Sequence, residues 1–394
     1  MRAGSLRWIL LLALIISLAG AGLTAWSADT PSGSTKSIVA ALQPFVDRQE
    51  LAGAVTLVAD KDKVLSLDTV GYADVAAKKP MRPDTVFWIA SQSKSITAAA
   101  LMILVDAGKV SLDDPIEKYL PEFKDQWVAV EQDKEHMLLK RPARRITVRQ
   151  ALSHTSGLPF RSAMEQPTLD GLPLRDTVRS HAMTPLQSEP GTKFLYSNAG
   201  INTAARIIEV VTSMSYEAFL DERLLRPLGM KDTTFWPNDE QLKRLAKAYK
   251  PNAAKTGLEE TTIGQLTYPL NNRHRYPMPA GGLFSTAEDV GRFCQMVLNG
   301  GTFHGQRILS EDAIAQMTRK QTGDALKEAY GLGWSTGGKA FGHGGALSTN
   351  MTIDPKRGLI TVFHVQHAGF LGNGNQSQAA FRKAAEGTFG AIKN

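Results

Sequence analysis

A serine and a lysine three residues apart stand at the start of a strongly apolar stretch. Ser91 and Lys94 precede the apolar run 98–105, and Gly108 ends the pattern. Strong helix formers that lead to a terminal glycine predict a helix. Ser91 then lies at or just before the first turn, where free backbone N–H groups and the positive end of the helix dipole favour negative charge. Residues three apart share a helix face, so the Lys94 amine can approach the Ser91 hydroxyl.

This pairing suits nucleophilic catalysis. A serine is a weak nucleophile at neutral pH and needs an adjacent base. A lysine that is desolvated against an apolar helix can lose its proton and serve as that base. Chance alone provides about one Ser-x-x-Lys in a chain of this composition. The remaining parts of a site must therefore be sought elsewhere in the sequence.

A second candidate pair is Tyr196 and Asn198, which run into a predicted helix over 199–213. A tyrosine acts as an acid or base where a neighbouring cation lowers its pKa. The Asn198 amide offers a donor and an acceptor that can hold a substrate amide or orient Lys94. The alternative is that both are only helix-start residues.

A third candidate is His343, within the glycine-rich stretch 342–345 that precedes predicted strands over 349–353 and 359–363. Glycines beside it would let a substrate approach the backbone closely. His367 also precedes an x-Gly, but it does not open a strand pair. A further predicted hairpin, over 54–67, lies near the other end of the chain.

Three other polar or reactive patterns are weaker. His154 and Ser156 lie at a helix end, where side chains usually cap the backbone. Ser335 lies in a Gly-x-Ser-x-Gly stretch, but a hairpin follows it instead of the helix that a nucleophile elbow requires. Cys294, the single cysteine, falls on the apolar face of a predicted helix and is expected in the core.

The N-terminus predicts export. Arg2 and Arg7 precede an apolar run over 9–23, and small residues follow at 25–27. This is the pattern of a signal peptide over residues 1–27, which would place the mature chain in the periplasm or outside the cell. An uncleaved membrane anchor is the alternative.

The composition narrows the partners. The chain has 394 residues and a formal net charge of +7, and its basic residues are scattered. Scattered charge indicates solubility and does not favour nucleic-acid binding. The eight histidines form no ligand cluster, so we expect neither a metal nor another cofactor. The oligomeric state is left open.

The three motifs together resemble a known group. Ser91/Lys94, Tyr196/Asn198 and His343/Gly345 have the order and spacing of the serine hydrolases related to class C β-lactamases and DD-peptidases, which include esterases. The stretches 152–158, 227–233 and 281–289 resemble that family as well.

The resemblance implies an α/β (α+β) fold of the β-lactamase/transpeptidase-like type. An antiparallel sheet built from both chain ends would be flanked by helices, with a mainly helical region inserted. One hydrolase domain would cover residues 28–394, with its sheet part over about 28–90 and 278–394 and its helical part over about 91–277.

The resemblance also implies roles. Ser91 would be acylated, and Lys94 and Tyr196 would share the acid and base work. A cationic Lys94 is expected to depress the pKa of Tyr196. The expected substrate-binding residues are Asn198, His343, Gly345 and Ala346. The backbone N–H groups of Ser91 and Ala346 would form the oxyanion hole.

One departure bears on the substrate. The third motif reads His343-Gly344-Gly345, where β-lactamases commonly have Lys-Thr-Gly. A histidine can be neutral at pH 7, so it provides no fixed positive charge for a substrate carboxylate. We therefore expect a small ester or amide substrate, with an esterase-like or D-peptidase-like activity. The alternatives are a true β-lactamase and a non-catalytic penicillin-binding or scaffold protein. Whether segments 122–146 and 255–277 cover the site is left open.

Overall fold

The computed structural model describes residues 35–390. The predicted signal peptide lies outside the described residues. Between residues 35 and 390, the helices are all too short or too polar to cross a bilayer.

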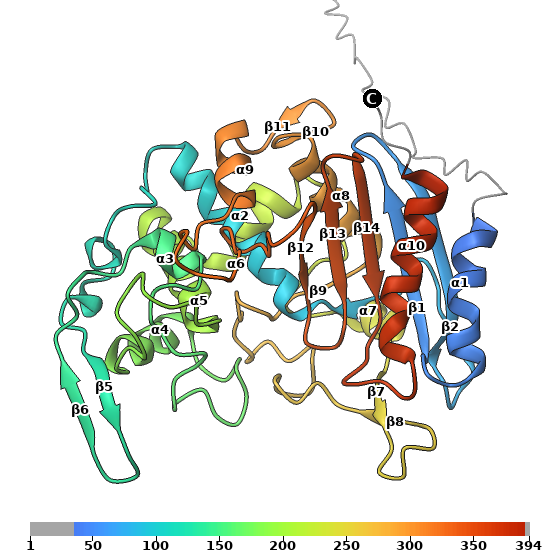
Figure 1. The fold of residues 1–394 in the computed structure, drawn as a ribbon, viewed down its shortest axis with the longest axis horizontal. Coiled ribbons are helices and arrows are strands. Elements are labelled where there is room, and N and C mark those ends of the chain that lie inside the picture. Colours follow the sequence, from blue (N-terminus) through green and yellow to red (C-terminus); the bar gives the residue numbers. More distant parts are fainter. Residues whose placement is uncertain (1–34, 391–394) are drawn as a thin grey trace, which may run out of the picture.

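An antiparallel sheet of six strands joins the two ends of the chain (Figure 1). Its order is β12-β13-β14-β1-β2-β3, so strands from the C-terminal part lie beside strands from the N-terminal part. These strands are β1 (Gly53–Ala59), β2 (Val64–Asp74), β3 (Lys79–Pro80), β12 (Phe341–Gly344), β13 (Asn350–Asp354) and β14 (Leu359–His364). The predicted fold class is confirmed, and both predicted hairpins are present.

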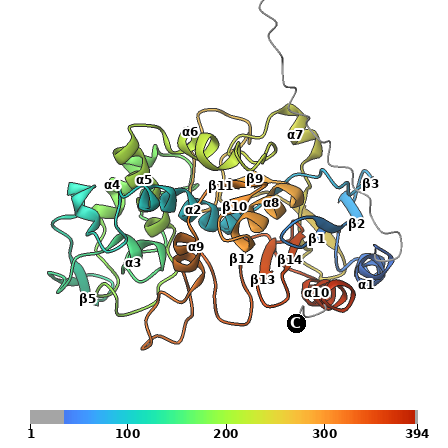
Figure 2. The same ribbon diagram turned by 90° about the horizontal axis from the view of Figure 1, so that it is seen from above.

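Helices cover both faces of the sheet (Figure 2). Residues alternate between the two faces of a strand. Val58 and Phe363 face α1 and α10, whereas Leu57 and Val362 face the cluster that contains α8. The helices are α1 (Thr35–Asp47), α2 (Ser93–Asp106), α3 (Val148–Leu152), α4 (Leu174–Met183), α5 (Asn198–Thr212), α6 (Tyr216–Leu220), α7 (Asp239–Arg244), α8 (Ala287–Leu298), α9 (Glu311–Thr318) and α10 (Ser377–Phe389).

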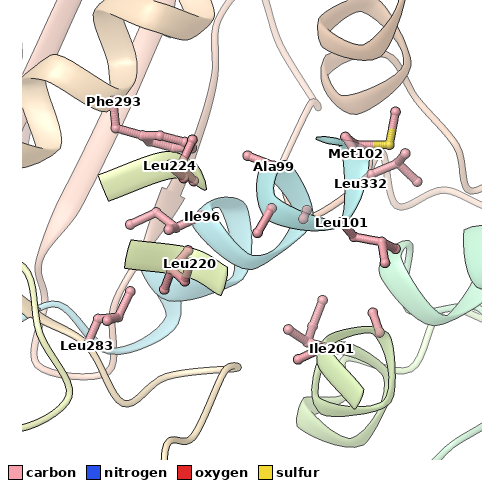
Figure 3. Packing of buried hydrophobic residues seen from close by; sticks show 14 of the residues in the cluster. Ile96, Ala99, Leu101, Met102, Ile201, Leu220, Leu224, Leu283, Phe293 and Leu332 are labelled. Atoms are coloured by element: carbon pink, nitrogen blue, oxygen red, sulfur yellow. The ribbon is translucent and has the colours of Figure 1, made fainter. Parts of the chain in front are cut away.

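Helix α2 runs through the middle of the main core (Figure 3). It is buried from Ser93 to Leu104, in keeping with its almost unbroken apolar sequence. Ile96 lies near Leu220, and Leu101 lies on the side of Ile201. Since packing surrounds the helix, its first turn has a fixed position in the molecule.

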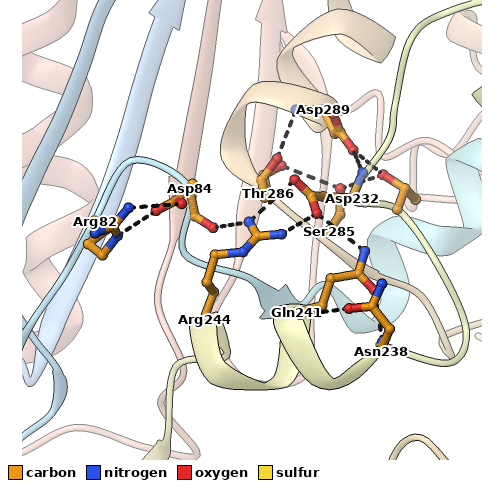
Figure 4. A network of polar contacts seen from close by, with 10 residues as sticks. Arg82, Asp84, Asp232, Asn238, Gln241, Arg244, Ser285, Thr286 and Asp289 are labelled. Atoms are coloured by element: carbon orange, nitrogen blue, oxygen red, sulfur yellow. Dashed lines mark hydrogen bonds and ion pairs between the residues drawn. The ribbon is translucent and has the colours of Figure 1, made fainter.

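A polar network holds the segment that leads into α2 (Figure 4). Strand β4 (Phe87–Trp88) pairs with β9 (Phe284–Ser285) just before the serine. Arg244 bonds both the Asp84 carbonyl and the Asp232 carboxylate. Thr286 caps α8, because its side-chain oxygen accepts a 3.2 Å bond from the Asp289 N–H. The network therefore ties α7, α8 and the chain before Ser91 together.

The remaining strands form three small hairpins. They are β5 (Val128–Gln132) with β6 (Met137–Lys140), β7 (Ala248–Pro251) with β8 (Leu258–Thr261), and β10 (Thr302–Phe303) with β11 (Gln306–Arg307). The first of these lies within segment 122–146 and projects from the end of the helical region that is remote from the sheet (Figure 1). That segment does not line the site described below.

Candidate active site

Ser91 lies in a tight turn directly before α2. The turn, Ala90–Gln92, is a single 3₁₀ turn, and α2 begins at Ser93. Ala90 has a φ of +47°, a left-handed conformation that an L-residue rarely adopts. Strain of this kind persists where the surroundings fix the backbone, and it concentrates at active sites. Ser91 remains partly accessible at the edge of a cavity.

Lys94 has no exposed surface. Its Nζ lies 3.1 Å from Ser91 Oγ, 2.7 Å from Asn198 Oδ1 and 2.7 Å from the Ala280 carbonyl. Asn202, one turn along α5 from Asn198, accepts a bond of 3.0 Å from the Ala280 N–H. Burial lowers the pKa of the Lys94 amine to about 7. The amine therefore has a large neutral fraction at neutral pH.

Tyr196 lies beside Lys94, just before α5. Lys94 Nζ is 4.7 Å from the centre of its ring, and its hydroxyl bonds Ser91. The expected depression of its pKa is wrong. Burial raises the pKa of Tyr196 to about 12, although the bond to Ser91 acts in the opposite direction. The loss of solvation outweighs the lysine, which is itself largely uncharged near neutral pH.

The end of strand β12 closes against the serine turn. A side chain on Gly345 would lie 2.6 Å from the Ile89 carbonyl oxygen and 2.1 Å from Thr349 Oγ1, so only glycine allows this approach. The Gly345 N–H donates to the Thr349 carbonyl at 2.7 Å. Gly345 and Ala346 line the same cavity as Ser91.

His343 does not line that cavity. Its ring is buried, with Nε2 2.8 Å from the Tyr330 hydroxyl and Nδ1 2.7 Å from the Gly344 carbonyl. Burial and the neighbouring Lys94 lower its pKa to about 4, so it is neutral at pH 7. A direct contact between this ring and a substrate stays a prediction; the geometry favours a role through the backbone.

His154 is also buried beside the site. Its ring centre lies 4.5 Å from that of Tyr196 and 4.6 Å from that of Tyr330. Its Nδ1 accepts a 3.2 Å bond from the Ser197 N–H. This imidazole therefore supports the turn that carries Tyr196, in agreement with the structural role favoured from the sequence. Ser156 likewise bonds backbone, accepting from Leu158 N–H at 3.2 Å.

The cavity over Ser91 measures about 300 Å³. Its wall is largely apolar, with an amide contributed by Gln265. It is lined by Trp88, Ala90, Ser91, Phe160, Tyr196, Asn198, Gln265, Met278, Ala280, Gly281, Gly344, Gly345 and Ala346. A larger cavity of about 390 Å³ lies between α4, α5 and the segment at Tyr276, and it contains none of the predicted site residues. We therefore assign the candidate active site to the smaller cavity, which contains Ser91, Tyr196 and Asn198.

Two loops, 159–171 and 263–278, supply the outer wall of the cavity, and we call them the wall loops. Asp170 and Arg275 join them through a buried ion pair, with carboxylate oxygen and Nε 2.7 Å apart. Leu169 N–H also donates to the Gln265 carbonyl at 2.9 Å. Segment 255–277 thus contributes to the site through Gln265, a question that the sequence left open.

Comparison with known proteins agrees with this geometry. The model of the Beta-lactamase family matches residues 38–384. The chain belongs to the beta-lactamase family. It is 33% identical over 387 residues to Protein Rv1367c of Mycobacterium tuberculosis, covering 88% of this chain and 95% of that protein. It is 28% identical over 346 residues to esterase EstB of Burkholderia gladioli, covering 80% and 81%.

Among solved structures, the chain is similar to EstCE1, described as a hydrolase with promiscuous acyltransferase activity. The TM-score is 0.74 at 25% identity, covering 89% of this chain and 98% of that one. The protein is thus a serine hydrolase of the beta-lactamase family, and its relatives include one named as an esterase and others named as putative D-alanyl-D-alanine carboxypeptidases.

Ser335, the alternative nucleophile suggested by the sequence, does not line the cavity at Ser91. In this beta-lactamase-family chain, Ser335 is exposed and pairs through its backbone with Gly342 and Tyr330. It therefore extends the edge of the sheet and does not lie on a strand-to-helix elbow. Cys294 is buried in the core, with its sulfur 3.8 Å from that of Met351.

Several residues in or beside the site could not be predicted from the sequence. The Ala280 carbonyl, the Tyr330 hydroxyl and the cavity-lining Phe160 and Gln265 carry no motif of their own. Ala280 directly precedes a Gly-Gly pair, which marked a loop but not its partner. Tyr330 comes 13 residues before His343 in the sequence, and only folding shows the bond between them.

Proposed function

We propose that the protein hydrolyses small uncharged esters through an acyl-enzyme on Ser91. The observation that carries this proposal is the environment of the Lys94 amine. Its nitrogen faces two oxygens that can only accept, Asn198 Oδ1 and the Ala280 carbonyl, and a third atom, Ser91 Oγ, that can donate. A neutral amine fits this set, with its two N–H groups on the two carbonyl-type oxygens and its lone pair towards the Ser91 hydroxyl, and the pKa of about 7 makes that form available at neutral pH.

The proposed acylation step follows from that match. The two N–H groups of the neutral Lys94 amine donate hydrogen bonds to Asn198 Oδ1 and the Ala280 carbonyl. Its lone pair then faces the Ser91 hydroxyl and accepts the proton as Ser91 attacks the ester carbonyl. Tyr196 keeps its own proton at neutral pH and is placed to protonate the leaving alkoxide. The N–H groups of Ser91 and Ala346 would receive the developing oxyanion, since the Gly345 N–H is already bonded to Thr349.

The wall of the cavity supports an uncharged acyl group. Trp88, Phe160 and Met278 present apolar surface, and Gln265 adds an amide. Of the described residues that line the cavity, none is charged. His343 is neutral and faces Tyr330, so it provides no charge for a carboxylate. Burying an unpaired carboxylate is costly, so acids should bind poorly.

The decisive experiment compares initial rates of p-nitrophenyl butyrate hydrolysis by the mature chain and by Ser91→Ala. We expect kcat/KM to fall roughly 10³-fold or more, with an unchanged circular dichroism spectrum and Tm. Ser335→Ala is the matched control and should retain activity. Activity that survives in Ser91→Ala would refute the proposal. A folded wild type without turnover on a panel of esters would favour the scaffold alternative.

A second measurement tests the charge of the acyl group. Mono-p-nitrophenyl succinate has the leaving group of p-nitrophenyl butyrate and a terminal carboxylate in place of the methyl group. We expect its kcat/KM to be lower by roughly tenfold or more, because the carboxylate would be desolvated without a partner. The uncharged methyl ester of the succinate should recover most of the rate. Equal rates for the acid and the butyrate would contradict this selectivity.

We also infer export, from the sequence pattern of residues 1–27 alone. N-terminal sequencing of the protein from the periplasm or medium should start near residue 28. A retained Met1 in the membrane fraction would favour the anchor instead.

A further inference from the structure

We propose that Tyr330 is a positioning residue for the oxyanion hole, acting through the ring of His343. This inference rests on the proposed function, because it assigns a role within the same Ser91 site. Tyr330 is not among the residues that line the cavity. Its hydroxyl is buried and lies 2.8 Å from Nε2 of His343.

The partners of the imidazole fix its tautomer. The Gly344 carbonyl, 2.7 Å from His343 Nδ1, can only accept a hydrogen bond, so Nδ1 carries the proton. Nε2 is then the acceptor, and the Tyr330 hydroxyl donates to it. The Gly344 carbonyl thus selects the tautomer, and Tyr330 stabilises it by donating to the bare Nε2, so that both ring nitrogens are bonded while the Nδ1–H holds the carbonyl.

That carbonyl belongs to the same peptide unit as the Gly345 N–H. The carbonyl end is held by His343, and the N–H end donates to the Thr349 carbonyl at 2.7 Å. The next N–H along the chain is that of Ala346, the proposed oxyanion donor. A peptide unit clamped at both ends sets the direction of this N–H before the substrate binds, as electrostatic preorganisation requires.

Because Gly345 contacts the serine turn, the orientation of the 344–345 peptide affects where the Ala346 N–H lies relative to Ser91. A Cβ on Gly345 would lie 3.3 Å from Ala90 Cβ and 2.6 Å from the Ile89 carbonyl oxygen. The two backbone segments that carry the proposed donors are therefore in van der Waals contact. Rotation of the 344–345 peptide would displace the Ala346 N–H relative to Ser91, and the wider packing of the fold would not change.

The test uses Tyr330→Phe, which removes the donor and keeps the ring. We expect kcat for p-nitrophenyl butyrate to fall roughly tenfold to a hundredfold, with KM changed by less than about threefold. Butylboronic acid provides the second readout, since its tetrahedral adduct on a serine places an oxygen in the oxyanion hole. Its inhibition constant should rise by the same factor as kcat/KM falls. Tyr249→Phe is the matched control: Tyr249 is buried, does not line the cavity, and its hydroxyl accepts from Val75 N–H at 2.8 Å.

Two further measurements make the outcome decisive. In His343→Asn, the short amide can donate to the Gly344 carbonyl without reaching Tyr330. In that background, Tyr330→Phe should cost no further activity, a coupling that a double-mutant cycle measures. The ¹⁵N spectrum of the wild type should show His343 as the Nδ1–H tautomer, a readout that needs neither turnover nor a variant.

The proposal is overturned by an unchanged kcat in Tyr330→Phe, by a fall in kcat without a matching rise in the boronate inhibition constant, or by an Nε2–H tautomer in the wild type. Failure of the proposed function has a different signature: activity would then be insensitive to Ser91→Ala, whatever the state of Tyr330.

Discussion

Lys94→Met is expected to lower kcat/KM for p-nitrophenyl butyrate roughly 10³-fold or more, while the protein still binds butyrate. Methionine fills the space of the lysine stem and leaves Ser91 without its proposed base. General-base catalysis by a positioned side chain contributes roughly 10² to 10⁴ in rate, and an unactivated serine also loses nucleophilicity. Because burial lowers the pKa of the Lys94 amine to about 7, forming the neutral base near pH 7 requires little free energy.

The pH profile of the wild type tests the same assignment independently. Only the neutral Lys94 amine can accept a proton, so kcat/KM should rise with pH through a midpoint near 7 and then level off. Tyr196 has a pKa of about 12 and should remain protonated over the plateau. His343, with a pKa of about 4, and His154, whose pKa burial also lowers well below its usual value, are neutral throughout this range.

Tyr196→Phe is the matched variant for this profile. It should reduce kcat but keep the midpoint near 7, because the base is still present. A wild-type rate that continues to climb tenfold per pH unit above pH 9 would contradict the assignment and make the Tyr196 phenolate the base.

The sequence predicted the parts of this fold that have a local pattern. Short apolar stretches joined by polar turns marked the hairpins around 54–67 and 347–365, and strong helix formers marked α2. The pairing of β1 with β14 follows no local pattern, since Val55 and His364 are far apart in the chain. That pairing came from the family resemblance, and the structure confirms it. Strands of two residues, such as β4 and β9, are too short to have a period.

The site shows the same limit in its electrostatics. The sequence placed Ser91, Lys94 and Tyr196 in one site by their spacing, but the pKa values of these groups depend on burial. A neighbouring lysine lowers the pKa of a tyrosine only while the lysine is charged and the tyrosine is solvated. Folding buries Lys94 completely and partly desolvates Tyr196, so the pKa of Lys94 falls and that of Tyr196 rises. Sequence spacing carries no measure of desolvation.

Mild acid is expected to destabilise the folded protein strongly. Four histidines are buried and have pKa values below that of an exposed imidazole: His154, His343, His364 and His367. In the unfolded chain each binds a proton as the pH falls through about 6.5. The folded state binds fewer protons, so stability is present above pH 6.5 and is lost as the pH falls towards the folded values of about 4 and about 3.

Two buried carboxyl groups act in the opposite direction. Burial raises the pKa of Asp289 to about 6 and also raises that of Asp68, so the folded state takes up protons there before the unfolded chain does. Near pH 5 the unfolded chain binds about four more protons at these histidines, and the two carboxyl groups offset about two of them at most, so stability falls by roughly 3 kcal/mol or more per pH unit. The destabilising effect of the four histidines therefore exceeds the stabilising effect of the two carboxyl groups. We expect Tm to fall steeply between pH 6.5 and pH 4.5.

His364→Leu is the variant that isolates this effect. Both ring nitrogens of His364 are buried, and neither has a hydrogen-bond partner within residues 35–390, so leucine removes the proton site without breaking a bond. The urea unfolding free energy of this variant, relative to wild type, should increase by roughly 1–2 kcal/mol between pH 7.5 and pH 5, because one fewer buried imidazole must charge on unfolding. His136→Leu, on the exposed β5–β6 hairpin, should show no such change. An equal pH dependence in His364→Leu and wild type would show that this imidazole is already protonated in the folded protein, and the acid sensitivity would then have to come from the other three buried histidines.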